Sequence, residues 1–429
     1  MKNYGEIALK GHRLCRGKIS TGFKVPVRSL DDLSIWYTPG VAAPSLAIAK
    51  DNGLVFEYTN KGNSIAVVSD GSRLLGLGNI GPEAALPVME GKSLLFKYLG
   101  DVDAVPICLG TQDPHEFVKA VEWIAPTYGG INLEDISQPK CFWIYQELAS
   151  RLEIPVFHDD QQGSAVVALA GLINALKVVN KDLRSVKLTL LGTGAAGRST
   201  FKLLVAAGAD PKRIVLVDSK GILSLDRKNL DSEKRELAAM TNSEGRVGGL
   251  EVALKDADGV IAFSTPGPGV ITREMVHSMA ENPVVFALAN PVPEILPEEA
   301  KKGGAAVVAT GRSDYPNQVN NSLGFPAIFR GMLDVHARGI NIQMMLAAAK
   351  AIASFAEEKG LSRGYIIPTM EEDDVFPREA VAVARAAMET GMARIKVDLD
   401  ELLEATRERL RKVRRMMKVA IAEGFIPNL

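Results

Sequence analysis

Two acidic pairs are the residues whose types and spacing most directly suggest chemistry. Glu134 and Asp135 lie between an apolar stretch and Pro139, whereas Asp159 and Asp160 follow a second apolar stretch and precede a predicted helix. Adjacent residues of an extended strand point to opposite faces, so both members of a pair can reach one ion only where the backbone turns. Carboxylates of this kind suit Mg²⁺ or Mn²⁺ rather than zinc. Helix capping would equally explain them, and both readings stay open on these residues alone.

A glycine-rich turn indicates a second site, for a dinucleotide. The sequence KLTLLGTGAAG begins at Lys187 and runs from an apolar strand into G-x-G-x-x-G and a helix. The glycines permit a tight turn, a close approach of the pyrophosphate and close helix–strand packing, and the helix N-terminus offers free N–H groups. The predicted cofactor-binding residues of the turn are Gly192, Thr193, Gly194, Ala195, Ala196 and Gly197.

The choice between NAD and NADP depends on the end of the next strand. Asp218 lies there, where a carboxylate would bind the ribose hydroxyls. A carboxylate repels a 2′-phosphate, which favours NAD. Lys220 could neutralise that phosphate if Asp218 turned away, so NADP remains the alternative.

These residues need strands and helices to position them, and the middle of the chain supplies a regular alternation of the two. Residues 164–179 read as a buried helix and residues 198–208 as a helix that ends at a glycine. Short apolar strands separated by helices predict a parallel, doubly wound sheet. The predicted strands fall within residues 187–191, 213–218, 258–265, 283–290 and 305–311.

The resulting fold class is α/β, in three regions. Residues 1–160 are expected to form an N-terminal domain that carries the acidic pairs. Residues 161–385 would form a Rossmann-type NAD(P)-binding domain with its core in 161–325, and residues 386–429 a helical segment at the C-terminus.

Composition excludes several classes of function. The 429 residues are 47% hydrophobic and 24% charged with a net charge of −1, which does not favour binding to nucleic acid or to a membrane surface. No apolar run is long enough to span a bilayer. Three widely spaced cysteines form no disulfide framework, so a reducing cytoplasm is the expected location.

Four segments resemble, in order and spacing, the signatures of the malic enzyme family in its short, single-module form. They are SIWYTPGVAAPS from Ser34, VVSDGSRLLGLGNIGPEAALPVMEGKSLLFK from Val67, NLEDI from Asn132 and FHDDQQGSA from Phe157. The resemblance covers roughly residues 20–390. It implies oxidation and decarboxylation of L-malate to pyruvate and CO₂ with NAD or NADP and with Mg²⁺ or Mn²⁺. It also allows decarboxylation of oxaloacetate.

The resemblance assigns roles to individual residues. Tyr37 would be the general acid that protonates the enol carbon, and Lys92 the base that accepts the hydroxyl proton of malate and contacts the substrate. Asp159 would orient Lys92. Taken singly, Tyr37 fits ordinary packing and Lys92 a solvated surface, and only their combination with the acids favours catalysis. The implied metal ligands are Glu134, Asp135 and Asp160.

Further resemblance points to substrate binding. Arg73 corresponds to an arginine that holds a substrate carboxylate, and Asn290, Asn320 and Asn321 to asparagines near the nicotinamide, with Asn290 also contacting the cofactor. The stretch from Arg73 to Lys92 is one residue longer than in the large eukaryotic-type enzymes. DDQQG replaces their usual DDIQG and leaves the aspartates unchanged.

The family is oligomeric, which implies a homodimer with Tyr37 near the subunit interface. Two alternatives to a malic enzyme remain. A dehydrogenase of another hydroxy or amino acid would explain the glycine turn but not the acidic pairs. A non-catalytic, redox-sensing dinucleotide-binding protein would bind NAD without turnover.

Overall fold

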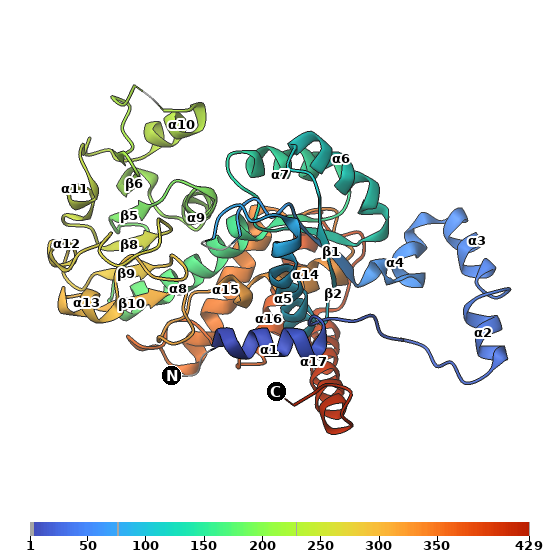
Figure 1. Cartoon of the computed structure of the whole chain (residues 1–429). Coiled ribbons are helices and arrows are strands. Elements are labelled where there is room, and N and C mark those ends of the chain that lie inside the picture. The colour runs from blue at the N-terminus through green and yellow to red at the C-terminus, as the bar shows by residue number, and fades with distance from the viewer. Residues whose placement is uncertain (1–3, 75–76, 229, 429) are drawn as a thin grey trace.

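Two β-sheets, the second of them parallel except at one edge and each flanked by helices, form the body of the chain in the computed structural model, which describes residues 4–74, 77–228 and 230–428 (Figure 1). The strands of the two sheets follow one another along the chain without interleaving. The α/β class predicted from the sequence is therefore confirmed, with one sheet for each of the two larger regions.

The first sheet has the strand order β2-β1-β3-β4 and is parallel throughout. Apolar strands before the acidic pairs were expected from the sequence, but this sheet as a unit was not. Because its strands are parallel, the carboxyl ends of β1, β3 and β4 meet at one edge, and the register pairs Leu133 with His158. The strands are β1 (Ser64–Ser69), β2 (Asp103–Cys108), β3 (Gly130–Leu133) and β4 (Val156–His158).

Helices cover both faces of the first sheet. Along β1, Ile65 and Val67 pack into the same core as the long helix α5, while Ala66 and Val68 pack on the opposite side. This alternation follows from the period of two along a strand. The covering helices are α5 (Pro82–Gly100) on one face and α6 (Pro114–Ile124) and α7 (Lys140–Arg151) on the other.

The second sheet has the order β10-β9-β8-β5-β6-β7, in which β5 lies between β6 and β8. The chain moves outward from β5 first in one direction and then in the other, which is the doubly wound Rossmann arrangement predicted from the sequence. The short β7 pairs antiparallel with β6, a departure from the purely parallel prediction. The strands are β5 (Leu188–Leu191), β6 (Ile214–Asp218), β7 (Gly221–Ile222), β8 (Gly259–Ala262), β9 (Val284–Ala287) and β10 (Val307–Thr310).

One continuous core joins the two sheets. It contains residues from β1 and α5, from one face of the second sheet, and from the almost entirely buried helix α8, so the domain junction is packed rather than linked loosely. A smaller core covers the other face of the second sheet. The helices of this region are α8 (Ser164–Val178), α9 (Ala195–Ala206), α10 (Ser232–Met240), α11 (Leu250–Leu254), α12 (Arg273–His277) and α13 (Pro297–Lys302).

The chain after the second sheet is largely helical, as predicted, and returns to the first domain. Helices α14 and α17 both contact α5, so the C-terminal region helps to position the catalytic candidates of the first domain. The helices are α14 (Phe325–Asp334), α15 (Ile342–Lys359), α16 (Val375–Glu389) and α17 (Leu399–Ala422). Among the described residues, no helix is long and apolar enough to cross a membrane.

Residues 4–58 do not join this body as a packed layer. Helices α2 and α3 project to one side in Figure 1, and among the described residues of α1 to α4 only Asp32 is buried. We call residues 18–54 the N-terminal arm. The helices are α1 (Tyr4–Cys15), α2 (Leu30–Trp36), α3 (Ala42–Lys50) and α4 (Val55–Tyr58).

Candidate active site

The two acidic pairs meet at the carboxyl edge of the first sheet. Oxygen atoms of Glu134, Asp135 and Asp160 all lie within 4.8 Å of one another. Asp135 has a φ of 53°, in the left-handed region, so the backbone turns directly after β3. That turn is the condition under which neighbouring acids can face one point. Three carboxylate oxygens in this arrangement match the ligands that Mg²⁺ and Mn²⁺ prefer.

A π-helical turn over Asp159–Gly163 contains both aspartates of the second acidic pair. Asp160 accepts a hydrogen bond from the backbone N–H of Asp135 at 3.2 Å, so it lies with Glu134 and Asp135 in the acidic cluster. Asp159 is fully buried and instead forms an ion pair with Lys92 of α5. Rare π-helical turns occur often at functional sites. Here the turn directs two adjacent aspartates to different partners.

Lys92 links the acidic cluster of Glu134, Asp135 and Asp160 to Asp159. Its Nζ lies 3.1 Å from Oε1 of Glu134, and 4.4 Å from the centroid of the Phe325 ring. The side chain is only 12% exposed. Burial by itself lowers the pKa of Lys92, but the carboxylates of Asp159 and Glu134 outweigh burial and raise it. Lys92 is therefore an ammonium ion held between two carboxylates in this structure.

Burial also makes ionisation of the neighbouring acids less favourable. It raises the pKa of Glu134 well above its usual value, although Lys92 opposes that shift, and it raises the pKa of Asp159 in the same way. Asn132, which the sequence analysis did not single out, donates to Oε2 of Glu134 at 3.0 Å. A pattern signal for it existed, since Asn132 is a polar residue within a buried strand.

Arg73 approaches this edge from the loop after β1. Its backbone N–H donates to the carbonyl of Asp135 at 3.1 Å. Ser72 beside it donates to Asp70 and accepts from the backbone of Ser137, which ties the loops after β1 and β3 together. Burial lowers the pKa of His158 to about 4; Asp160 opposes this decrease, and the nearby Arg73 guanidinium adds to it. The structure thus brings Arg73 to the acidic cluster.

The three predicted asparagines have different surroundings. Asn321 donates to Oδ2 of Asp159 at 2.6 Å, and so connects the nucleotide domain with the Lys92–Asp159 ion pair. Asn320 is engaged locally, because its Oδ1 accepts from the backbone and hydroxyl of Ser322 at 3.0 and 2.7 Å. Asn290 is exposed after β9, where its side chain faces Gly311.

The glycine turn after β5 has the conformation that its sequence predicts. Gly192 has a φ of 101°, which favours glycine, and a Cβ at Gly197 would collide with the carbonyl oxygen of Gly192. Gly194 faces the side chain of Gln138 in the first domain, where a Cβ would be 2.8 Å from Nε2. The predicted dinucleotide turn therefore lies against the segment that follows Glu134 and Asp135.

Asp218 ends β6 beside this turn, as predicted, but its carboxylate is already paired with cationic side chains. Arg227 contacts both of its oxygens, at 2.9 and 3.1 Å, and Lys234 contacts Oδ2 at 2.8 Å. Lys220, which the sequence analysis considered as the neutralising cation, reaches Asp218 only through its backbone N–H. Arg227 and Lys234 lie nine and sixteen residues after Asp218 in the sequence, and only the folded chain brings their side chains to its carboxylate.

Tyr37 is the one predicted catalytic residue that the single chain leaves apart from the others. It caps the C-terminal end of α2 in the N-terminal arm, and it is 72% exposed. Figure 1 shows α2 well separated from α5, which carries Lys92.

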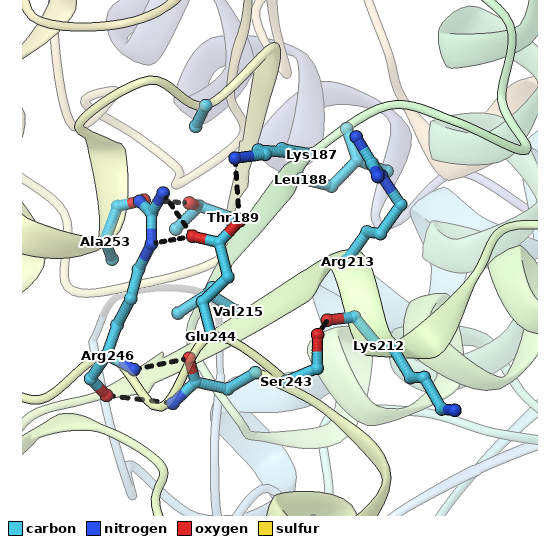
Figure 2. Close-up of a pocket in the computed structure, with 12 residues that line it drawn as sticks. Lys187, Leu188, Thr189, Lys212, Arg213, Val215, Ser243, Glu244, Arg246 and Ala253 are labelled. Atoms are coloured by element: carbon cyan, nitrogen blue, oxygen red, sulfur yellow. Dashed lines mark hydrogen bonds and ion pairs between the residues drawn. The ribbon is translucent and has the colours of Figure 1, made fainter.

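A pocket lies at the edge of the second sheet that is opposite the glycine turn (Figure 2). Glu244 there forms ion pairs with Lys187 at 2.7 Å and with Arg246 at 2.8 Å. Lys187 precedes β5 and Lys212 precedes β6, so this pocket lies at the amino ends of the strands. Dinucleotides bind at the carboxyl ends in this type of fold, so the pocket is not the cofactor site.

Comparison with family models matches both halves of the chain. Residues 16–149 match the malic enzyme N-terminal domain, and residues 161–388 match the malic enzyme NAD-binding domain. These ranges contain the predicted site residues described above except Asp159 and Asp160, which lie in the short stretch between them.

Similar proteins span nearly the whole chain. A protein of Bacillus subtilis named bifunctional malic/malolactic enzyme is 52% identical, covering 94% of this chain and 98% of the relative. A protein of Geobacillus stearothermophilus named NAD-dependent malic enzyme is also 52% identical, over 88% of this chain and 78% of the relative. The crystal structure of malic enzyme from Pyrococcus horikoshii has a TM-score of 0.92 at 53% identity, covering 96% of this chain and 97% of that one.

Proposed function

We propose that this chain, which belongs to the malic enzyme family, oxidises and decarboxylates L-malate to pyruvate and CO₂ while reducing NAD(P). The observation that supports this most directly is Lys92, held between Asp159 and Glu134 beside the carboxylates of Asp135 and Asp160. A dehydrogenase of another acid and a non-catalytic dinucleotide sensor are not favoured, since both family domains are present.

The donor set fits a divalent cation. Glu134, Asp135 and Asp160 would hold Mg²⁺ or Mn²⁺, because their oxygens converge within 4.8 Å and hard cations prefer carboxylate ligands. When bound, such an ion supplies Lewis-acid polarisation of the oxygen on C2 of the substrate.

Lys92 is the proposed base for the hydroxyl proton that leaves as hydride passes from C2 to the nicotinamide. A base must be neutral, and the neighbouring carboxylates raise the pKa of Lys92 against the effect of burial. Engagement of Glu134 with a cation would weaken that pull and favour the neutral amine. Asp159 is the proposed positioning residue, supported by its ion pair with Lys92 and by its hydrogen bond from Asn321.

Arg73 is the proposed partner of a substrate carboxylate, since its backbone is tied to Asp135 and its side chain is exposed at the cluster. Asn290, Asn320 and Asn321 are proposed to line the substrate side of the nicotinamide. In this structure Asn321 already contacts Asp159, and Asn320 caps a short turn through Ser322.

We further propose a homodimer in which the N-terminal arm of one chain supplies Tyr37 to the site of the other. The arm carries large apolar side chains that the chain itself does not cover, which is typical of an interface. Their exposure would be removed by a symmetric partner. The most exposed of these side chains are Phe23, Leu30, Ile35, Tyr37 and Leu46.

NAD is the proposed preferred cofactor, with NADP as the alternative. Asp218 at the end of β6 supports this preference, as does the name of the Geobacillus relative. The cytoplasm is the proposed location, in keeping with the three free cysteines.

Reduction of the nicotinamide with L-malate, followed by absorbance with NAD and NADP and with Mn²⁺ or a chelator, tests the reaction. We expect metal-dependent reduction with pyruvate as the product. Lys92→Ala is expected to abolish turnover while NAD affinity is retained, and Lys202→Ala, an exposed lysine of α9, serves as the control. Undiminished turnover by Lys92→Ala would contradict the assigned base.

Mixing two inactive variants tests the shared site. If Tyr37 acts on the partner's site, subunits with Tyr37→Phe and subunits with Lys92→Ala form heterodimers that each contain one intact site. After random exchange, the mixture should recover about a quarter of wild-type activity, because half of the dimers are mixed and each has one of its two sites intact. No recovery in a mixture proven to contain heterodimers would refute the exchange of Tyr37.

A further inference from the structure

A cavity of about 340 Å³ lies where the N-terminal arm joins the body of the chain. Both attachments of the arm border it, because Lys24 lies near the start of the arm, and Phe56 and Asn63 follow its end at residue 54. The other lining residues belong to the C-terminal ends of α5 and α14 and to α17. We call it the arm-base cavity. A molecule bound there would contact the arm and the body at once.

Arg330 is the buried cation of the arm-base cavity. Its side chain is only 2% exposed, and it donates two hydrogen bonds to Asp334, at 3.0 and 2.7 Å, and one to Oδ1 of Asn63. Arg409 of α17 donates to the same Asp334 through Nη1 at 2.9 Å. Two guanidinium groups thus share one carboxylate. Among the described residues, Nε and Nη2 of Arg409 have no hydrogen-bond partner, so they remain available to a ligand.

Lys24 is a second cation at the other end of the same row of side chains. Its Nζ lies 2.8 Å from Oδ2 of Asp103, and Asn63 donates to that oxygen at 3.0 Å, which continues the row to Arg330. The row therefore has cations at both ends, Lys24 on the arm and Arg409 on α17. Three cations and two acids line the cavity itself, namely Lys24, Arg330, Arg409, Asp101 and Asp334. The excess of positive charge favours an anionic ligand.

The size and the remaining walls of the cavity suit a small organic molecule rather than a single ion. Pockets for small molecules typically measure about 300–1,000 Å³. The rings of Phe56 and His336 stack with their centroids 4.7 Å apart, and both line the cavity. Burial lowers the pKa of His336, so its imidazole is neutral at physiological pH. These two rings offer a flat, uncharged surface to a carbon skeleton.

We infer that the arm-base cavity binds a small polycarboxylate, with one carboxylate held by Lys24 and another by Arg409, and that this ligand fixes the N-terminal arm against the body. Carboxylates at two ends of the ligand match cations at two ends of the row. The site itself does not depend on the proposed reaction. Its consequence for catalysis does, because the arm carries Tyr37.

Calorimetric titration of the full-length, metal-free protein with citrate tests the site. Arg409→Met and Lys24→Met should each weaken citrate by about tenfold or more, because each removes a charged hydrogen-bond donor. Arg411→Met is the matched control, since Arg411 is an exposed arginine of the same helix that does not line the cavity. It should leave the affinity within about twofold of wild type, because exposed charges are screened. Inorganic phosphate, which cannot reach both ends, should bind more weakly than citrate.

Hydrogen exchange tests the effect on the arm. Citrate should slow amide exchange in residues 18–54 of the wild-type protein, because a ligand that contacts Lys24 restrains the local opening of that segment. The protection should be lost in Arg409→Met, although Arg409 lies outside the arm. Citrate that binds at the cavity without slowing exchange in the arm would overturn the proposed restraint.

Citrate bound at the active site must be distinguished from citrate in the cavity. Binding that is lost in Arg73→Met but kept in Arg409→Met would overturn the arm-base site, as would the absence of binding at about 10 mM citrate. Phosphate that binds as tightly as citrate would contradict a ligand with two anionic ends. Should Arg409→Met fail to fold, Lys24→Met on the exposed arm decides alone. Failure of the proposed reaction would appear instead as absent malate oxidation, which leaves the calorimetric result unchanged.

Discussion

Glu379 offers a test of the physical reasoning that is independent of catalysis. It lies in the middle of α16, which packs between α14 and α15, and its side chain is completely buried. Within the part of the chain that the structure describes, neither carboxylate oxygen has a hydrogen-bond partner. Burial raises the pKa of Glu379 well above its usual value of 4.5, so the folded protein holds it as a neutral acid.

Glu379→Met is therefore expected to stabilise the protein. A buried polar group without a partner costs about 1–3 kcal/mol, and methionine fills a similar volume without that cost. Because folding raises the pKa of this carboxyl, the folded state is most favoured at pH values below the pKa of the unfolded chain, where the group is protonated in both states. That stability is lost as pH rises from the unfolded value of 4.5 toward the folded value. The advantage of the variant should thus grow by up to about 1.4 kcal/mol for each pH unit in that window.

Urea unfolding at one fixed protein concentration, repeated in steps from acidic to mildly alkaline pH, measures this difference in unfolding free energy. Glu389→Met is the control, because Glu389 lies on the same helix but is exposed. The control should show no comparable dependence on pH. A Glu379→Met variant that is less stable than wild type, or whose advantage shrinks as pH rises, would refute the assignment of a neutral, unpartnered acid.

Three further outcomes follow from the candidate site. Mn²⁺ at about one hundred times its dissociation constant should raise the unfolding free energy by about 2.7 kcal/mol, measured by urea titration, and Glu134→Gln should remove most of that gain. Gly197→Ala should abolish NAD binding in calorimetry, because its Cβ would meet the carbonyl oxygen of Gly192; normal affinity would contradict the tight turn. Asn321→Leu, which removes the hydrogen bond to Asp159, should lower kcat about tenfold or more with NAD affinity unchanged; an unaltered kcat would show that this bond does not support catalysis.

Local patterns were sufficient for the nucleotide half of the fold. Alternation of apolar strands and helices between Lys187 and Thr310 predicted β5, β6, β8, β9 and β10, and the structure has each of them. The reason is that a strand buried on both faces is a short apolar run whatever surrounds it. The antiparallel β7, only two residues long, leaves no such run and was missed.

The first domain was harder to predict because its strands depend on pairing between distant segments. The sequence located the acids at strand ends, but it left open whether they bind a metal or cap helices. The order β2-β1-β3-β4 decides their proximity, since it places the ends of β3 and β4 side by side. The left-handed φ of Asp135 and the π-helical turn at Asp159 then direct the side chains to their separate partners.

The sequence by itself determined which residue types this protein has for its chemistry, because glycine turns, acidic pairs and family signatures are properties of short segments. Only the tertiary structure decided their partners: Lys92 with Asp159 and Glu134, and Asp218 with two cations from beyond β7. Ion pairing and burial depend on distances across the fold, which no local pattern encodes. The same reasoning applies to Tyr37, which the fold of one chain leaves on its exposed arm.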